Sequence, residues 1–445
     1  MGKIFLFSPI GGTDPISNDN CRDGAFLHCC RVYKPDLIYI YMSKWTIHNE
    51  DVDSRYSFCL TKLYESLDKE LHFERIDRPE LEQVQDFNYF YDDFRMEISK
   101  IMQTMTADDK LIINTSSGTP AMKSALVVMT TLGDIDATLI QVVTPNKSIN
   151  THVHKDYDVE TLWELNEDNL PDFENRCSVI ECPSLVQLKN EELIKKLINS
   201  YDYVAALDVV NMMPDKHTDK YKFLIEYADN RLKLSKTDLM RIEKEHTDID
   251  FLPNRNQEYR DITEYALSLF VKRKREDYAD FIRGLTPLIA RLFILVLKKE
   301  ANIDVIKYCS LDRSIGSYKW SIEKMRSDDK AKEWLDVWRE QLNHEFKEGY
   351  INSESLWVLI KHYCRSDVFA CADRLREVER KIRNTAAHEI SIITEARVKQ
   401  MTNCSCDDII NDIKEVFKYT GITMTKEGWD SYEQMNRCII EAITP

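Results

Sequence analysis

Strand-like and helix-like segments alternate through the first 145 residues, and this pattern constrains the fold more than any other feature of the sequence. Short apolar runs predict strands at residues 4–8, 37–41, 72–76, 111–114 and 137–143. Helical patterns fill the intervals up to about Tyr33 and at residues 55–71, 90–105 and 120–132. Strands that alternate with helices of this length form βαβ units and a parallel sheet. We therefore predict a Rossmann-like open sheet at the N-terminus.

The rest of the chain is predicted to be mainly helical. Residues 146–183 are polar and irregular, with a short strand expected at residues 177–181 where the chain returns to the sheet edge. No glycine occurs between Gly133 and Gly284, which favours helix over residues 185–265. A second helical block follows from about residue 270. The predicted fold class is α/β plus all-α, with domains at residues 1–184, 185–270 and 271–445.

Composition excludes several classes of protein. The chain has 11 glycines in 445 residues, against roughly 7% in average usage. All-β sandwiches and barrels, which need many glycine turns, are therefore disfavoured, and collagen-like chains are excluded. The longest strongly apolar stretch, Leu292–Leu297, is shorter than the about 20 residues that span a bilayer. No secretion signal is found. We expect a cytoplasmic protein without membrane contact.

Cysteine and histidine spacing argues against disulfides and metal. The 12 cysteines form no CxxC pair or disulfide framework, so reduced thiols are expected. His152 and His154 lack a second ligand pair at finger-like spacing, so no metal site is predicted.

Charge is distributed unevenly. Residues 271–445 carry 30 basic and 29 acidic residues, which leaves 30 basic and 47 acidic residues, a net of −17, for residues 1–270. A polyanion such as RNA is repelled by the first part unless a local basic site attracts it. The C-terminal part is therefore the better candidate for binding RNA.

Two loops of the predicted sheet carry candidate ligand groups. Ligands of open parallel sheets bind beyond the carboxyl ends of the strands, where residues 8–14 and 114–120 lie. The second loop offers hydroxyls and ends with Thr119 as an N-cap and Pro120 in the first helical turn. A helix N-terminus of this kind suits phosphate. The candidate binding residues are Ser8, Gly11, Gly12, Thr13, Asp14, Asn114, Thr115, Ser116, Ser117, Gly118, Thr119 and Lys123.

Known phosphate motifs do not match these loops. A Walker A motif ending at Lys123 requires glycine where Ser117 and Met122 stand, and no G-x-G-x-x-G follows the first strand. A dinucleotide cofactor is therefore not expected. Two interpretations remain: a site for a polyphosphate or oligonucleotide, or loops that are merely capped turns.

Residues 371–389 form a second candidate site when projected on a helix. Leu375, Val378, Ile382 and Ala386 fall at apolar spacing and are expected to face a core. Arg376, Arg380 and Arg383 make one basic stripe, and Lys381, Asn384 and His388 lie on a neighbouring face. Because Arg383 and His388 are five residues apart, about 140° on an ideal helix, they can converge only through a helix end or through a second copy of the chain.

These residue types suffice for RNA cleavage through the ribose 2′-hydroxyl. Histidine titrates near neutrality and can transfer a proton, and arginine binds phosphate oxygens. Such chemistry needs no metal. The alternative is a structural histidine beside a solvent-facing basic stripe.

Both signals resemble one family. Arg383-Asn384-Thr385-Ala386-Ala387-His388 is similar to the R-N-x-x-x-H motif of HEPN ribonucleases, and residues 114–120 resemble the ligand loop of CARF domains. A Rossmann-like domain, a helical connector and a HEPN domain in this order resemble the Csm-type CARF–HEPN ancillary endoribonucleases of type III CRISPR systems. The resemblance covers essentially the whole chain.

The resemblance implies a mechanism and partners. The family pairs two CARF domains in a homodimer around a cyclic oligoadenylate, which allosterically activates metal-independent cleavage of single-stranded RNA in antiviral defence. It implies catalytic roles for Arg383, Asn384 and His388 from both chains, with RNA contacts from Arg376, Arg380 and Lys381. No cofactor is expected, and cyclic hexa-adenylate is favoured over tetra-adenylate as activator. Some members cleave their activator, and Thr115 is then the candidate for positioning it.

Two other functions stay open at the level of sequence. One is a non-catalytic, nucleotide-sensing dimeric regulator that binds nucleic acid, although no clear helix-turn-helix with a basic recognition helix is found. The other is a Rossmann-type cofactor enzyme, which the missing glycine fingerprint disfavours.

Overall fold

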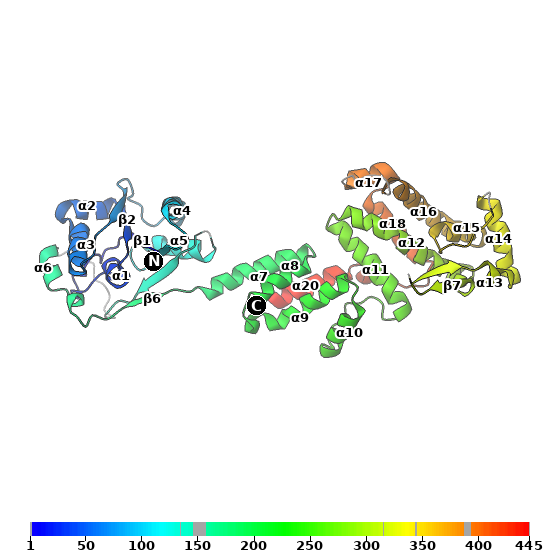
Figure 1. The fold of residues 1–445 in the computed structure, drawn as a ribbon, viewed down its shortest axis with the longest axis horizontal. Coiled ribbons are helices and arrows are strands. Elements are labelled where there is room, and N and C mark those ends of the chain that lie inside the picture. The colour runs from blue at the N-terminus through cyan, green and yellow to red at the C-terminus, as the bar shows by residue number, and fades with distance from the viewer. Residues whose placement is uncertain are drawn as a thin grey trace. The chain divides into compact units, whose positions relative to one another are not determined.

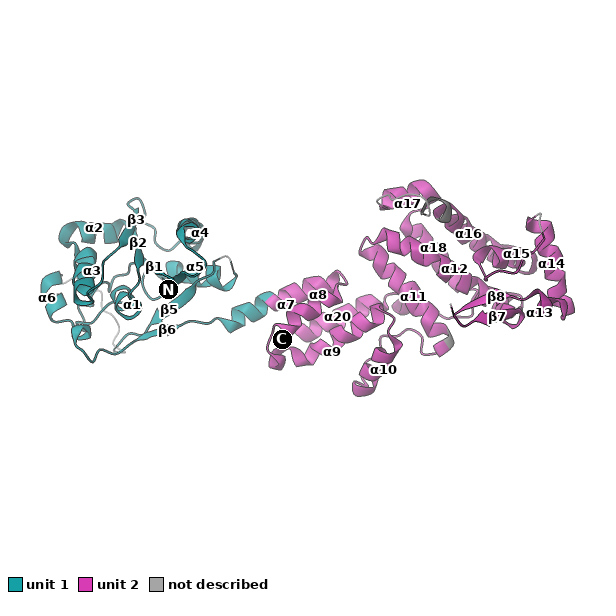
Figure 2. Cartoon of the chain, in the orientation of Figure 1, with its two compact units in different colours: residues 1–189 teal, residues 190–445 magenta. Residues whose placement is uncertain are grey.

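The computed structural model describes residues 2–133, 135–145, 157–314, 316–342, 345–386 and 393–444, and at residues 258 and 383–386 it describes the backbone alone. The chain separates into two compact units, residues 1–189 and residues 190–445 (Figure 2). None of the described helices is both long and apolar enough to cross a membrane.

Six described strands of the first unit form one sheet in the order β3-β2-β1-β4-β5-β6. They are β1 (Ile4–Pro9), β2 (Leu37–Ser43), β3 (Phe73–Arg78), β4 (Lys110–Asn114), β5 (Thr138–Val142) and β6 (Cys177–Val179). The first five run parallel, and β6 pairs antiparallel with β5 at the edge. The predicted Rossmann-like sheet is confirmed, and so is the return of the chain to its edge near residue 177.

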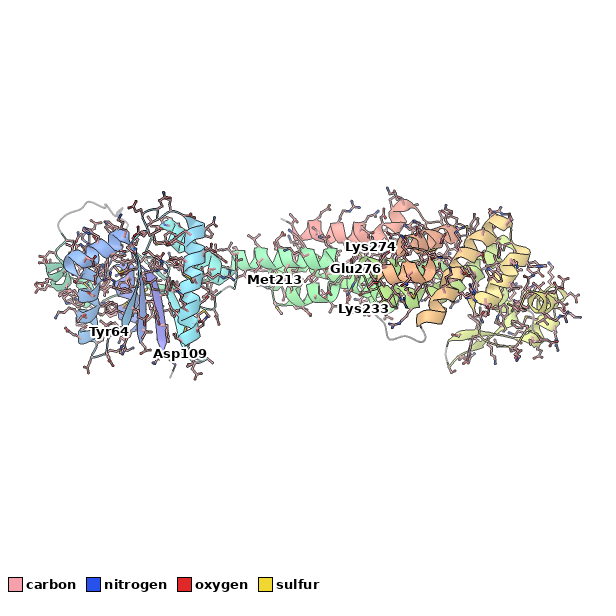
Figure 3. The ribbon with its side chains drawn as sticks, turned by 90° about the horizontal axis from the view of Figure 1, so that it is seen from above. Tyr64, Asp109, Met213, Lys233, Lys274 and Glu276 are labelled. Carbon is pink, nitrogen blue, oxygen red and sulfur yellow. The ribbon has the colours of Figure 1, made fainter. Side chains whose placement is uncertain are left out.

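Helices cover both faces of this sheet (Figure 1). Alternate residues of a strand point to opposite faces, so Leu6 and Ile112 pack with α1 and α3, whereas Phe7 and Ile113 pack with α4 and α5. Tyr64 of α3, labelled in Figure 3, is buried and donates its hydroxyl proton to the Pro35 carbonyl oxygen at 2.6 Å. The helices are α1 (Ala25–Tyr33), α2 (Lys44–Asp53), α3 (Arg55–Ser66), α4 (Phe87–Thr104), α5 (Pro120–Thr131), α6 (Val159–Glu164) and the 3₁₀ turn η1 (Glu167–Asn169).

The second unit is built from helices around one apolar core. Its helices are α7 (Pro183–Asn199), which begins in the first unit, α8 (Tyr203–Asn211), α9 (Asp215–Leu232), α10 (Lys236–Glu245), α11 (Gln257–Lys274), α12 (Tyr278–Glu300), η2 (Val305–Tyr308), α13 (Ile322–Arg326), α14 (Asp329–Leu342), α15 (Ser353–Tyr363), α16 (Ser366–Ala386), α17 (Glu395–Thr402), α18 (Cys406–Phe417), α19 (Lys426–Trp429) and α20 (Ser431–Ile443). The predicted helical character is confirmed. A hairpin of β7 (Cys309–Asp312) and β8 (Ser317–Trp320), which the sequence did not predict, interrupts the helices.

One predicted domain boundary falls inside a helix. Helix α11 continues through residue 270 and ends at Lys274, which Figure 3 labels together with Glu276. Glu276 has a left-handed φ of 62°. The chain direction therefore changes a few residues after the expected position. The division into three domains stays a prediction.

Candidate functional site

The loops after β1 and β4 meet at the carboxyl edge of the sheet, the place where the sequence predicts a ligand site. A Cβ atom on Gly11 would lie 2.8 Å from the backbone nitrogen of Gly118, so the two loops touch through their main chains. Gly118 has a φ of +85°, a left-handed conformation that residues with a side chain rarely adopt. Glycine is thus required at both positions for separate reasons.

Asp14 braces the first of these loops from inside. The side chain is buried, and its two carboxylate oxygens accept hydrogen bonds from the backbone amides of Gly11, at 2.8 Å, and Phe26, at 2.9 Å. Burial raises the pKa of Asp14, although these hydrogen bonds and nearby Lys123 oppose the shift. The carboxylate therefore ties the loop to the start of α1.

Asn114 joins the two loops. Its amide nitrogen donates to the hydroxyl oxygens of Ser8 and Ser117, both at 2.9 Å, and its amide oxygen accepts from the backbone nitrogen of Ser116 at 2.9 Å. Ser8 and Asn114 are fully buried. These predicted ligand residues form the interior framework of the loops.

Thr115 and Thr119 also have internal partners. The Thr115 hydroxyl donates to the Ile140 carbonyl oxygen at 2.9 Å, and the Thr119 hydroxyl donates to the Val84 carbonyl oxygen at 2.6 Å. Thr119 also accepts from the backbone nitrogen of Met122 at 3.4 Å. The predicted N-cap at the start of α5 is therefore confirmed.

A polar cavity of about 270 Å³ lies at the junction of the loops. Seven of the predicted ligand residues line it: Gly11, Gly12, Thr13, Ser116, Ser117, Gly118 and Lys123. The other walls come from residues that the sequence did not single out, namely Ser17, Asn20, Asp23, Gly24, Ala25, Val142, Val143, Thr144, Pro145 and Arg176. Backbone amides, hydroxyls and two cationic side chains therefore surround one space.

Lys123 lies between this cavity and a second one. Burial lowers the pKa of Lys123, and the carboxylate of Asp14 partly offsets the effect. The second cavity, of about 530 Å³, is bordered by Thr115, Ser116 and Lys123 together with residues of α5 and β5. A cation at this position favours an anionic group in either cavity.

Arg176 belongs to a buried ion-pair network behind the first cavity. Its terminal Nη2 donates to the carboxylate of Asp168 at 2.6 Å and lies 3.1 Å from Nδ1 of His28. His28 Nε2 accepts from the backbone nitrogen of Arg176 at 3.0 Å. Arg31 forms a second pair with Asp23 at 2.6 Å. The network connects α1 to the segment that leads into β6.

This network contains a metal-like set of ligands that is already neutralised. Among the described residues, Asp23, His28 and Asp168 place three ligand-type atoms within 4.8 Å of one another. Because Arg176 and Arg31 contact the same carboxylates, the charge that a cation would neutralise is already paired. We therefore interpret the cluster as structural support for the cavity wall.

Helix α16 carries the second predicted site. Leu375, Val378 and Ile382 are buried, as their spacing predicts. The side chain of Ala386 lies outside the described residues. The apolar face of this helix therefore packs into the core of the second unit.

The basic residues of α16 have acidic neighbours. Arg376 is largely buried and pairs with Glu354 at 3.0 Å and with Glu379 at 3.2 Å. Arg380 is exposed and pairs with Glu377 at 2.8 Å, and Lys381 lies 3.5 Å from the same carboxylate. Of the three predicted RNA contacts, Arg380 has the most exposed side chain.

Two of the three proposed catalytic residues, Arg383 and Asn384, stand near the end of the same helix. The backbone of Arg383 and Asn384 is helical, since α16 extends to Ala386, but their side chains are outside the described part of the chain. His388 also lies outside the described residues. Their catalytic roles therefore stay predictions from the motif.

Comparison with known proteins identifies related domains along the chain. The Cas_Csm6 CARF domain matches residues 74–177, the CRISPR-associated protein Csm6 6H domain matches residues 180–232, and the Cas_Csm6 HEPN domain matches residues 251–440. The order of these matches agrees with the sheet, the first helices of the second unit and the block that contains α16.

Full-length relatives agree with these matches. The CRISPR system endoribonuclease Csm6 of Mycobacterium tuberculosis is 30% identical over 99% of both chains. Csm6 of Streptococcus thermophilus is 30% identical over 66% of both chains. The structure of Enterococcus italicus Csm6 bound to cyclic hexa-2'-fluoro-hexa-dAMP shares the fold, with a TM-score of 0.66 and 18% identity over 99% of this chain and 100% of that chain. The chain therefore belongs to the Csm6 family of CRISPR-associated CARF–HEPN endoribonucleases.

Proposed function

We propose that this endoribonuclease is switched on by a cyclic oligoadenylate that binds at the junction of the β1 and β4 loops. The observation that carries the proposal is the polar cavity that Gly11 and Gly118 line together with hydroxyl side chains, Lys123 and Arg176, because groups of these kinds bind the phosphate of a phosphodiester. The cyclic hexa-adenylate analogue bound by Enterococcus italicus Csm6 supports this class of ligand. We favour a six-membered ring over a four-membered one.

The residues around the cavity divide into two roles in this proposal. Gly11, Gly12, Thr13, Ser117 and Gly118 contact the activator, and Ser116 and Lys123 contribute from the border with the second cavity. Ser8, Asp14 and Asn114 hold the loops, since they are buried and bonded internally. Thr115 borders the second cavity and is the candidate for positioning the activator for its own cleavage.

RNA cleavage is assigned to the R-N-x-x-x-H motif. His388 removes the proton of a ribose 2′-hydroxyl, the oxygen attacks the adjacent phosphorus, the bond from phosphorus to the 5′-oxygen of the next nucleotide breaks, and that oxygen takes a proton from the protonated His388 of the second copy. Arg383 stabilises the charge on the phosphorane, and Asn384 orients the groups. The products are a 2′,3′-cyclic phosphate and a free 5′-hydroxyl. Side chains supply every proton, so this route requires no metal.

Two copies of the chain complete this site in the proposal. Arg383 and His388 diverge by about 140° on one ideal helix, and a two-fold axis brings the groups of both chains together. Arg376, Arg380 and Lys381 are proposed to guide single-stranded RNA toward it. Residues 1–184, 185–270 and 271–445 are the proposed sensor, connector and nuclease domains.

The test is cleavage of a fluorogenic RNA with cyclic hexa-adenylate or cyclic tetra-adenylate added separately. His388→Ala should lower the activated rate by at least about 100-fold, as expected for loss of a general acid or base, while calorimetry shows unchanged activator binding. His362→Ala, on α15, is the matched control. EDTA should not inhibit, and a 2′-deoxy substitution at the cleaved nucleotide should block cleavage. Full activity of His388→Ala would contradict the proposed site.

A further inference from the structure

A third cavity, of about 710 Å³, is lined in part by the same glycines. It shares Gly11, Gly12 and Gly118 with the polar cavity and is otherwise formed by the end of β2, the start of α2, the segment after β3 and the start of α5. Its remaining lining residues are Ile10, Ser43, Lys44, Trp45, Thr46, His48, Leu81, Glu82, Val84, Thr119, Pro120 and Met122.

The inner wall of this cavity is apolar and firmly held. Ile10, Leu81 and Met122 are buried members of the two cores of the first unit. The hydrogen bond from Thr119 to the Val84 carbonyl oxygen fastens α5 to the segment after β3. The wall is therefore a formed surface that does not depend on a loop closing over it.

Trp45 adds an exposed aromatic ring to this wall. It lies in the first turn of α2 and keeps 45% of its surface exposed. Beside it, Lys44 pairs with Glu82 across the gap between α2 and the segment after β3. A single exposed tryptophan is ordinary on a protein surface. Here, however, the ring borders a cavity that shares Gly11, Gly12 and Gly118 with the proposed phosphate site.

These shared glycines restrict what the cavity can hold. In a cyclic oligonucleotide each phosphate is joined to nucleosides on both sides, so a phosphate at Gly11 and Gly118 places a base within reach of the neighbouring walls. The polar cavity, lined by hydroxyls and charged groups, suits the sugar and phosphate. The apolar wall and the indole suit the flat face of a base.

We propose that this cavity binds one nucleobase of the activator, stacked on the indole of Trp45. The inference rests on the proposed function and adds a residue that sets activator affinity. The competing occupant of this cavity is an apolar segment of another protein. If the cavity binds such a segment instead of a base, the affinity for the activator does not depend on Trp45.

The test compares Trp45→Ala, Trp45→Phe and Tyr89→Ala in the full-length protein, with cyclic hexa-adenylate and cyclic tetra-adenylate as probes in calorimetry. Tyr89 is the matched control because it is 40% exposed on α4 and lines none of the three cavities. Loss of one stacked base should weaken binding about 10- to 100-fold in Trp45→Ala. Trp45→Phe should restore most of the affinity, and Tyr89→Ala should bind as the wild type.

A second readout tests contact directly. Stacking should quench part of the tryptophan fluorescence when cyclic hexa-adenylate is added to the wild-type protein. Trp45→Phe should still bind the activator but should lose this quench. Wild-type affinity in Trp45→Ala, or an unchanged quench in Trp45→Phe, would overturn the inference and leave the proposed function standing. Failure of the wild type to bind either ring would instead refute the proposed function.

Discussion

Asp168 has no exposed side-chain surface, and four partners contact its carboxylate. They are the side chains of His28, Arg22 and Arg176 and the backbone nitrogen of Asp23, which donates a hydrogen bond at 2.9 Å. Burial alone would raise its pKa, but the hydrogen bond from His28 and the charge of Arg176 outweigh burial and lower the pKa of Asp168 to about 2. The ionised carboxylate is therefore favoured in the folded state.

This lowered pKa gives an acid-sensitive contribution to stability. Because the folded pKa of Asp168, about 2, lies below its ordinary value of 3.8, the contribution is complete above about pH 4 and is lost as the pH falls toward 2. This difference in pKa between the folded and unfolded states corresponds to about 2 kcal/mol in the free energy of unfolding. We expect Asp168→Asn to be about 3 kcal/mol less stable than wild type at pH 7, and this gap to narrow between pH 4 and pH 2.

Denaturant unfolding of the first unit at several pH values measures the gap. The matched control is Asp136→Asn, because Asp136 is an exposed residue of the same unit. A gap between wild type and Asp168→Asn that stays constant down to pH 2 would show that the carboxylate does not act through its charge.

At the scale of elements, the contact between the β1 and β4 loops determines the shape of the polar cavity. An alanine at Gly11 would place Cβ 2.8 Å from the backbone nitrogen of Gly118, so the loops must separate. We expect Gly11→Ala to weaken binding of cyclic hexa-adenylate by about tenfold or more, measured by calorimetry. Gly349→Ala is the control, because its Cβ would meet nothing closer than 4.0 Å. Equal affinities of Gly11→Ala and the wild type for cyclic hexa-adenylate would show that the loops accommodate the added Cβ without a change in the binding site.

The sequence predicted the elements whose apolar residues repeat regularly. The strands of the sheet, the helices α1, α3, α4 and α5 and the buried face of α16 all follow from such repeats. Helix α2 was missed because its buried residues are the polar side chains Thr46, Asn49 and Glu50, which leave no apolar stripe. The available signal for the importance of this segment was its position directly after β2, because ligands of open parallel sheets bind beyond the carboxyl ends of the strands.

The candidate site was predictable only in part. The glycines and hydroxyls stand in the loops that strand positions indicate, so six of them, and Lys123 one turn into the following helix, could be placed at one cavity. Arg176 could not, because its hydrogen bond with His28 joins residues 148 positions apart. Periodicity reports local structure, and it carries no information on such a pair. The only hint was that Arg176 directly precedes the expected edge strand.

At the scale of the whole molecule, the proposed nuclease site needs two chains. We expect the activated cleavage rate per chain to fall when the protein is diluted below its dimerisation constant, because each composite site is lost with the second copy. Mass photometry at the assay concentrations would give the fraction of dimer. A constant rate per chain in a fully monomeric sample would contradict the composite site, whereas His362→Ala should follow the wild-type curve.

The antiparallel strand at the edge of the sheet has a consequence for producing the sensor part alone. Residues 177–179 pair with residues 140–142 and so occupy the open side of β5. A fragment cut before Cys177 would present unpaired main-chain groups along an apolar strand, a template on which other copies can add. Such a truncation is expected to precipitate even though every residue that lines the polar cavity is present. A useful fragment must extend past Val179.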